Sequence, residues 1–151
     1  MLRKRINEAL KEAMKAKRQR AVSTLRLILA ALKDRDIAAR AKGNTEGLGD
    51  GEITGLLQTM IRQRRESIAL YEQGGRLELA EAEREEIEVI EGFLPRQMGE
   101  DEMRQAVAGV IAEIGAAGLK DMGRTMAELR TRFGGQMDFG KASGVVKASL
   151  G

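Results

Sequence analysis

The 151-residue sequence contains neither cysteine nor histidine. Without cysteine there are no disulfides and no thiolate nucleophiles, and without either residue zinc sites and relays between serine and histidine are excluded. Aromatic residues make up only 3% of the chain, and tryptophan is absent. Because proteins hold unpaired bases largely by stacking them on aromatic rings, this shortage leaves little capacity for binding single-stranded nucleic acid through its bases.

Long apolar runs are also missing. No stretch approaches the about 20 apolar residues of a membrane-spanning helix, and no secretory apolar segment stands at the amino terminus. A first helix lying on a membrane would need interfacial tryptophan or phenylalanine, which this segment lacks. We therefore expect a soluble, cytoplasmic protein without a membrane partner.

Nucleotide-binding signatures are absent as well. No glycine-rich loop is followed by Lys-Ser or Lys-Thr, and the paired glycines at 74–75 and 134–135 are predicted to end helices. The glutamates of residues 76–93 have the chemistry to bind Mg²⁺, but they spread around most of one helix and are better explained as a solvated face. We predict no catalytic residue, no metal site and no cofactor.

Proline occurs once, at position 95. Because proline cannot donate to a helix ladder and biases the preceding residue away from helical angles, we expect one helical pattern to end near Leu94 and another to begin near Glu100. The predicted organisation is an amino-terminal lobe, residues 1–95, and a smaller carboxy-terminal lobe, residues 96–151, with Phe93 and Leu94 packed at the joint. The alternative is an ordinary helix end within a single domain.

Helix-forming residues dominate the remaining composition, which favours helices over sheets. Apolar residues recur at helical spacing in seven segments, and no segment alternates like a strand. The predicted fold is all-α, with an amino-terminal helical bundle and a carboxy-terminal lobe of three helices. Asp50 and Asp138 are placed to cap the third and the last helix. The predicted helices cover about residues 2–14, 21–41, 52–73, 76–93 and 100–114, a short segment that contains Met126 and Leu129 and ends around 133–135, and a last segment after Asp138.

Two charged residues fall on helix faces that are otherwise apolar. At 100° per residue, Arg64 points into the apolar stripe of the third predicted helix, and Glu83 into that of the fourth. Counted outward from Gly74-Gly75, the antiparallel partner of Arg64 lies near position 85. We predict a partly buried ion pair between Arg64 and Glu83, with Glu86 as the second choice, that fixes the register of the two helices. The alternative is an Arg64 held free for a phosphate.

The net charge of +3 hides an uneven distribution. Residues 1–20 are strongly basic, whereas residues 76–102 are strongly acidic. This asymmetry predicts one surface that faces a polyanion and another that repels it.

Five short motifs lie along the chain, and their order is more informative than any one of them. They are Ser23-Thr24-Leu25-Arg26, Arg62-Gln-Arg-Arg-Glu-Ser67, Phe93-Leu94-Pro95-Arg96-Gln97-Met98, Lys120-Asp121-Met122-Gly123-Arg124-Thr-Met126 and Gly135-x-x-Asp138. Together they resemble the GatB/YqeY family over essentially the whole chain, and in particular its free-standing YqeY-type member.

This resemblance implies a helical lobe joined to a smaller helical lobe. It also implies a relation to the tail of the GatB subunit of the glutamine-dependent tRNA amidotransferase, which helps to engage tRNA while the chemistry resides elsewhere. The family suggests a label of carbon–nitrogen ligase activity with glutamine as amido-N-donor, but nothing here resembles the Ser-Ser-Lys amidase centre of that enzyme. By the same resemblance, Lys120, Arg124 and the Gly135/Asp138 turn become RNA-facing positions. Gln136 and Phe139 depart from the basic residue and the glycine expected in that turn, which weakens its assignment to phosphate.

We predict an accessory protein that binds tRNA, or a tRNA-handling enzyme complex, through basic helical surfaces and without an active site of its own. With so few aromatics, binding would follow the shape of folded RNA. We assign structural roles to Arg64, Glu83, Pro95, Gly135 and Asp138. The predicted RNA-facing residues are Lys15, Lys17, Arg18, Arg62, Arg65, Lys120, Arg124, Arg130, Arg132, Lys141 and Lys147.

Two alternatives remain beside RNA binding. The basic residues could be ordinary solvated helix faces, which need no ligand. The chain could instead be a protein-docking module that does not contact RNA, with Met122, Met126, Met137 and Phe139 forming an adaptable apolar patch. Those four residues are equally suited to closing the core of the small lobe, and this is the interpretation we favour for them.

Overall fold

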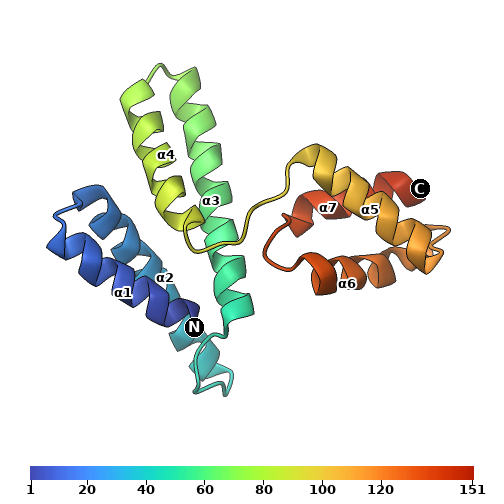
Figure 1. Ribbon diagram of the computed structural model, residues 1–151, viewed down its shortest axis with the longest axis horizontal. Coiled ribbons are helices and arrows are strands. Elements are labelled where there is room, and N and C mark those ends of the chain that lie inside the picture. Colours follow the sequence, from blue (N-terminus) through green and yellow to red (C-terminus); the bar gives the residue numbers. More distant parts are fainter. The chain divides into compact units, whose positions relative to one another are not determined.

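The computed structural model describes residues 1–151 and is entirely helical, which confirms the all-α prediction (Figure 1). Seven α-helices and one short 3-10 helix are joined by turns and loops, without any strand. The elements are α1 (Leu2–Lys15), α2 (Gln19–Ala41), α3 (Asp50–Gln73), α4 (Leu77–Glu91), α5 (Glu100–Ile114), η1 (Leu119–Asp121), α6 (Met122–Phe133) and α7 (Phe139–Leu150).

The chain divides into two compact units, Met1–Leu94 and Pro95–Gly151. Helix α4 ends at Glu91, two residues before the predicted end, and residues 92–99 are not helical. None of the helices is long and apolar enough to cross a membrane.

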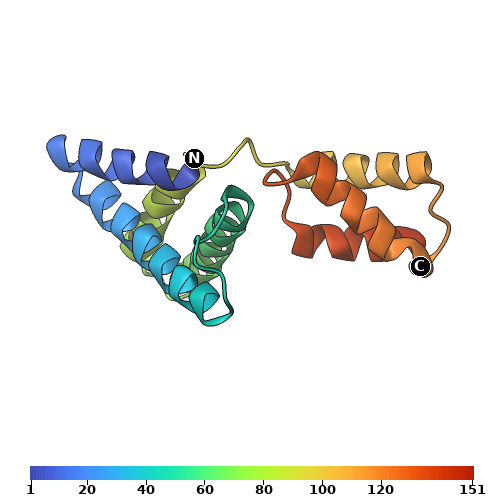
Figure 2. The same cartoon turned by 90° about the horizontal axis from the view of Figure 1, so that it is seen from below.

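The first unit consists of two helical hairpins that share one core. Helices α1 and α2 form one hairpin and α3 and α4 the other, with α2 also packing against α4 (Figure 2). Their apolar stripes meet at fully buried side chains such as Ile6, Ile28, Leu57 and Ile90. Burying a side chain of this size contributes about 1.5–3 kcal/mol to the stability of the fold. The helical periodicity of the apolar residues places these side chains on the helix faces that form the core.

Asp50 does not cap the third helix as predicted. It is the first residue of α3, behind Gly49, and its carboxylate points instead to the start of α1. There it accepts hydrogen bonds from the Leu2 N–H at 3.1 Å and from the Met1 amino group at 2.7 Å. An acidic side chain suits this place, because the first N–H groups of a helix lack partners within the helix.

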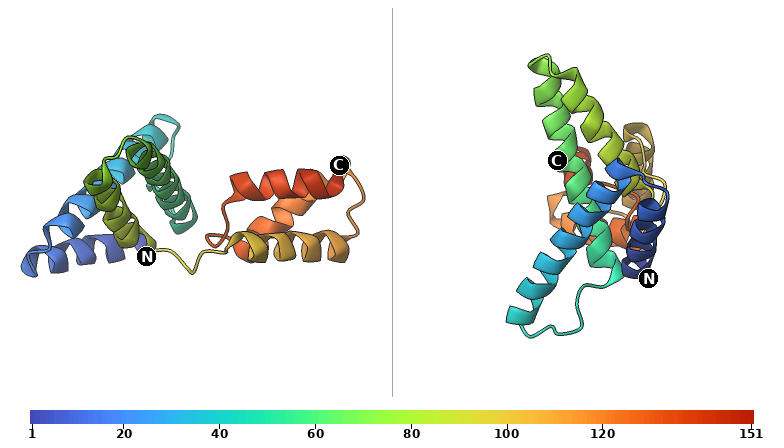
Figure 3. Two further views of the ribbon diagram at one scale, coloured as in Figure 1. Left: turned by 90° about the horizontal axis from the view of Figure 1, so that it is seen from above. Right: turned by 90° about the vertical axis from the view of Figure 1, so that its left-hand side faces the viewer.

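The second unit is a bundle of three helices in which α5, α6 and α7 each pack against the other two (Figure 3). Its core contains Val107, Leu129, Met137 and Val146, all fully buried. As predicted, Asp138 caps α7, because its carboxylate accepts hydrogen bonds from the N–H groups of Gly140 and Lys141.

The predicted apolar docking patch belongs to this core. Met126 and Met137 are buried, and Met122 and Phe139 are partly buried against the same cluster. The favoured interpretation of these four residues is therefore confirmed, and they form no exposed methionine surface.

The predicted ion pair between Arg64 and Glu83 is present, but the closer partner of Arg64 is Glu86, the second choice. The Arg64 Nε atom donates to Glu86 at 2.9 Å, whereas Glu83 lies 3.9 Å from the same atom. The Arg64 side chain is 13% exposed and also donates to the Met60 carbonyl at 3.2 Å. The second-choice glutamate is thus the hydrogen-bonded partner, and Arg64 is not held free for a phosphate.

Candidate nucleic-acid interface

The cations of the first unit separate into those that already have a carboxylate partner and those that do not. Helix α4 is rich in glutamates, and arginines of α2 and α3 pair with several of them. Arg20 pairs with Glu85 at 3.0 Å, and Arg65 with Glu91 at 3.3 Å. Because these guanidinium groups are engaged in joining helices, Arg65 is a weaker candidate for RNA contact than the sequence suggested.

Unpaired cations line the outer face of α1. Lys4, Lys11 and Lys15 are exposed, take part in no ion pair and fall within a stripe about 40° wide on the helix. Glu8 lies at the edge of this stripe. Such a row of solvated ammonium groups along one helix suits contact with successive phosphates.

The turn after α1 extends this basic face. Lys17 and Arg18 are exposed, and neither has an ion-pair partner. Lys17 adopts a φ of 57°, the only positive φ outside glycine in the chain. A residue with a β-carbon is strained in this region, so the turn holds a lysine where glycine would fit with less strain. Arg62, on α3, is also exposed and has polar contacts of its own.

Two of the predicted arginines of the second unit are paired on α6. Arg124 lies 3.3 Å from Asp121, and Arg132 bonds to Glu128 at 2.8 Å and also to Glu113 on α5. The Arg132 guanidinium lowers the pKa of the Glu113 carboxyl by hydrogen bonding and by its charge. These arginines tie local turns and neighbouring helices together, which sequence spacing alone did not reveal.

The remaining predicted cations of this unit are unpaired. Lys120, Lys141 and Lys147 are exposed and form no ion pair, and Arg130 lies over the Phe139 ring with 5.6 Å to its centroid. Sequence reasoning missed a further cation, Arg104 on α5, which lines a groove together with Lys141. In the sequence, position 104 is only a polar residue outside the apolar stripe of its helix, which does not distinguish it from other surface residues.

The sequence of nearly the whole chain can be compared with known proteins. A family model described as Yqey-like protein matches residues 3–150. The chain belongs to the YqeY-like family. This YqeY-like chain is also 30% identical, over 111 residues, to "Altered inheritance of mitochondria protein 41, mitochondrial" of Lachancea thermotolerans. The match covers 72% of the YqeY-like chain and 57% of that relative, so it spans little more than half of the relative's length.

The Gly135/Asp138 turn of this YqeY-like chain serves its own fold. The Gly135 carbonyl accepts a hydrogen bond from the Gln97 side chain at 2.6 Å, and the next carbonyl, of Gln136, accepts one from the Met98 N–H at 2.8 Å. The Asp138 carboxylate occupies the first N–H groups of α7, where a phosphate would otherwise bind. These hydrogen bonds, like the departure of Gln136 and Phe139 from the family pattern, therefore argue against phosphate binding by this turn.

One carboxyl group of the YqeY-like chain, that of Glu83, has a raised pKa. Burial raises the pKa of Glu83, the neighbouring Glu86 raises it further, and Arg64 lowers it. Glu83 lines neither the α5–α7 groove nor the cleft that Phe93 and Ala13 help to form. A perturbed carboxyl can mark a catalytic site, but here its surroundings are an ion pair between packed helices.

Proposed function

We propose that this YqeY-like protein binds folded tRNA, or a tRNA-containing complex of the amidotransferase type, without an active site of its own. The observation that supports the proposal is the sorting of its cations. Arginines next to the acidic helix α4 are consumed by ion pairs, whereas the lysines of α1 and of the second unit are exposed and unpaired. Phosphate contacts made by the second group displace no ion pair within the protein.

Shape rather than sequence is the feature that such a surface can recognise. Ammonium groups contact phosphates of any sequence, and the chain offers few aromatic rings for stacking on unpaired bases. We therefore expect similar affinities for different folded tRNAs and a lower affinity for an unstructured strand of the same length.

A fluorescence titration of folded tRNA over a range of salt concentrations tests the proposal. The logarithm of the association constant should fall linearly with the logarithm of the salt concentration, because binding releases counterions. Replacing Lys4, Lys11 and Lys15 together by glutamine should weaken binding roughly tenfold or more at low salt, whereas Glu8→Lys should strengthen it. Absence of binding at low salt, or an affinity indifferent to salt, would refute RNA binding.

Capture from lysate separates RNA binding from protein docking. If the tagged protein retains its partners only while RNA is intact, ribonuclease treatment should release them. A partner that stays bound after ribonuclease treatment would support the docking module instead. The purified protein alone should not consume glutamine and ATP.

A further inference from the structure

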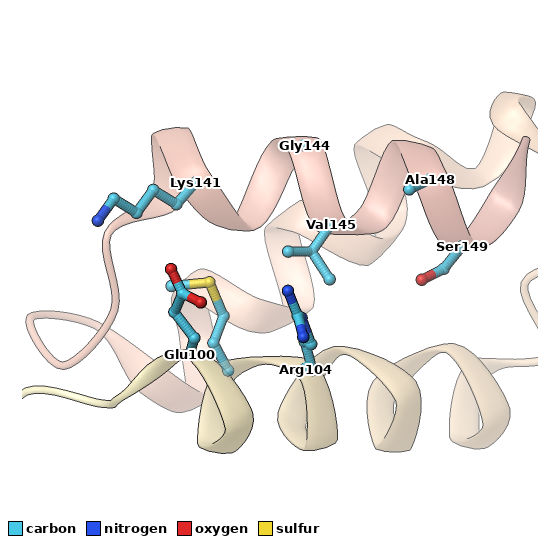
Figure 4. A pocket seen from close by; sticks show the side chains of 8 residues that line it. Glu100, Arg104, Lys141, Gly144, Val145, Ala148 and Ser149 are labelled. Atoms are coloured by element: carbon cyan, nitrogen blue, oxygen red, sulfur yellow. The ribbon is translucent and has the colours of Figure 1, made fainter.

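The second unit contains a groove between α5 and α7 with a volume of about 630 Å³ (Figure 4). Arg104 rises from α5 toward α7 inside the groove, and Ser149 directs its hydroxyl into the same space from α7. Lys141 stands at the end of the groove nearest the start of α5, opposite Glu100. We propose that this groove holds a stretch of RNA phosphate backbone, with Arg104 as the inner contact and Lys141 as the contact at its mouth.

The charges of the groove support an anionic occupant. Arg104 is exposed and forms no ion pair, although Glu100 lies one helical turn earlier on the same helix. By contrast, Arg96 of the same unit makes two hydrogen bonds of 2.8 Å to Glu102. Two cations and one carboxylate leave the groove with a net positive charge. A guanidinium group with free N–H donors is well suited to two phosphate oxygens.

The wall formed by α7 lets a backbone come close. Gly144 and Ala148 stand one turn apart along this wall. A β-carbon added at Gly144 would meet no atom within 4 Å, so packing does not require glycine there. Glycine inside a helix lowers helix stability by about 1 kcal/mol relative to alanine, and at this position it leaves open space beside the helix.

This inference rests on the proposed function, and the experiment keeps the two apart. The full-length protein is titrated with folded tRNA at low salt, and each variant is checked by circular dichroism and thermal unfolding. Arg104→Gln should weaken binding roughly tenfold and reduce the salt slope by about one. Arg96→Gln removes the same charge from a paired arginine and should leave the affinity within about twofold of the wild type.

Two further variants separate the groove from charge and from folding. Gly144→Leu fills the groove without changing charge and should weaken tRNA binding about as much as Arg104→Gln. Gly109→Leu, at an exposed glycine of α5 where an added β-carbon also meets nothing within 4 Å, is its control and should bind normally. Glu100→Gln removes the one carboxylate of the groove and should tighten binding, a gain that a merely structural role would not produce.

Each result has one meaning. If the wild type binds tRNA but Arg104→Gln and Gly144→Leu bind as well as their controls, the groove is not the site, although the proposed function stands. If the wild type does not bind tRNA at low salt, the proposed function fails and takes this inference with it. If Gly144→Leu instead loses a ribonuclease-resistant protein partner while its tRNA affinity is unchanged, the groove holds protein, and the phosphate proposal is overturned.

Discussion

A single guanidinium, that of Arg64, faces two carboxyl groups of α4. Both glutamates are largely shielded from solvent, with side-chain exposures of 22% for Glu83 and 18% for Glu86. Only Glu86 is within hydrogen-bonding distance. Partly buried charges lose much of their hydration, so their energetics depend strongly on which partner is bonded.

A double-mutant cycle should show this asymmetry. Arg64→Met should destabilise the protein by about 1–3 kcal/mol, because Glu86 is left without its partner in a partly buried place. The coupling energy of Arg64 with Glu86 should be about 1–2 kcal/mol and that with Glu83 below about 0.5 kcal/mol. Urea unfolding of the single and double variants measures both values. Equal coupling to the two glutamates would contradict the observed geometry.

Because the pKa of Glu83 is raised, replacing Glu83 should stabilise the protein, whereas replacing Arg64 should destabilise it. A carboxyl whose pKa is higher in the folded state adds stability below its unfolded value of about 4.3, and that stability is lost as the pH rises through the folded value. Glu83→Gln imitates the protonated form, so it should raise the melting temperature by a few degrees at pH 7 and leave it unchanged near pH 4. Glu78→Gln, on the exposed part of α4, is the control and should have little effect at either pH.

Two replacements of Lys17 can separate the effect of its charge on RNA binding from the effect of its backbone conformation on stability. Because its φ is 57°, Lys17→Gly should leave the stability equal to that of the wild type or raise it by up to about 1 kcal/mol. Lys17→Gln removes the same charge but keeps the β-carbon, so it should be no more stable than the wild type. If the α1 face binds RNA, both variants should lose tRNA affinity to the same extent, about two- to fivefold. Unequal losses would assign the effect to the turn conformation.

At the scale of elements, one carboxylate connects α1, α2 and the loop before α3. Asp36 accepts hydrogen bonds from two nitrogens of Arg3 at 2.8 and 3.0 Å and from the Leu48 N–H at 3.0 Å. Gly47, beside it, has a φ of 87°, and a β-carbon there would lie 3.1 Å from the Asp36 carboxylate. This ion pair therefore holds the loop in place, and Leu48 also packs against the core of the first unit.

The pH dependence of this connection has a defined sign. The hydrogen bonds from Arg3 and then from Leu48 lower the pKa of Asp36 in the folded state. Its contribution is therefore present above the unfolded value of about 3.9 and lost as the pH falls through the folded value. Asp36→Asn should lower the melting temperature by several degrees at pH 7, and the difference should shrink toward pH 2. A difference that is independent of pH would show that the carboxylate charge is not involved.

Helix periodicity was enough to predict the seven α-helices, because each amphipathic stripe marks a face that must be buried. It could not predict which side chains meet between helices. Positions 83 and 86 flank the predicted partner position of Arg64, and the rotation of α4 about its axis decides between them. Asp50 shows the same limit, since its cap depends on where the start of α1 lies in space.

The candidate interface was predictable only in part for a related reason. The sequence shows where cations are, but their availability depends on carboxylates from other helices, as for Arg65 with Glu91 and Arg132 with Glu113. Arg104 was missed because nothing local indicates that α7 leaves a groove beside it. Long-range packing therefore decides which cations can act.

At the scale of the whole molecule, the proposal requires unpaired cations of both units to contribute to binding. Counterion release is additive in the number of phosphates contacted, with a slope of about 0.7–0.9 per contact. Replacing Lys4, Lys11 and Lys15 by glutamine in the full chain should therefore lower the salt slope by about two. Replacing Lys120, Lys141 and Lys147 should lower it by a similar amount, and the combined variant should lose the sum of the two.

Titrations of the three variants with folded tRNA at several salt concentrations measure these slopes. A charge-matched control replaces Arg20, Arg65 and Arg84, which are all paired with glutamates, by glutamine. If this control lowers the slope as much as either lysine set, binding responds to net charge alone, and the distinction between paired and unpaired cations fails. If only one lysine set has an effect, one unit alone holds the RNA. Additive losses for the two lysine sets, with an unchanged slope for the control, are the pattern that a two-surface contact requires.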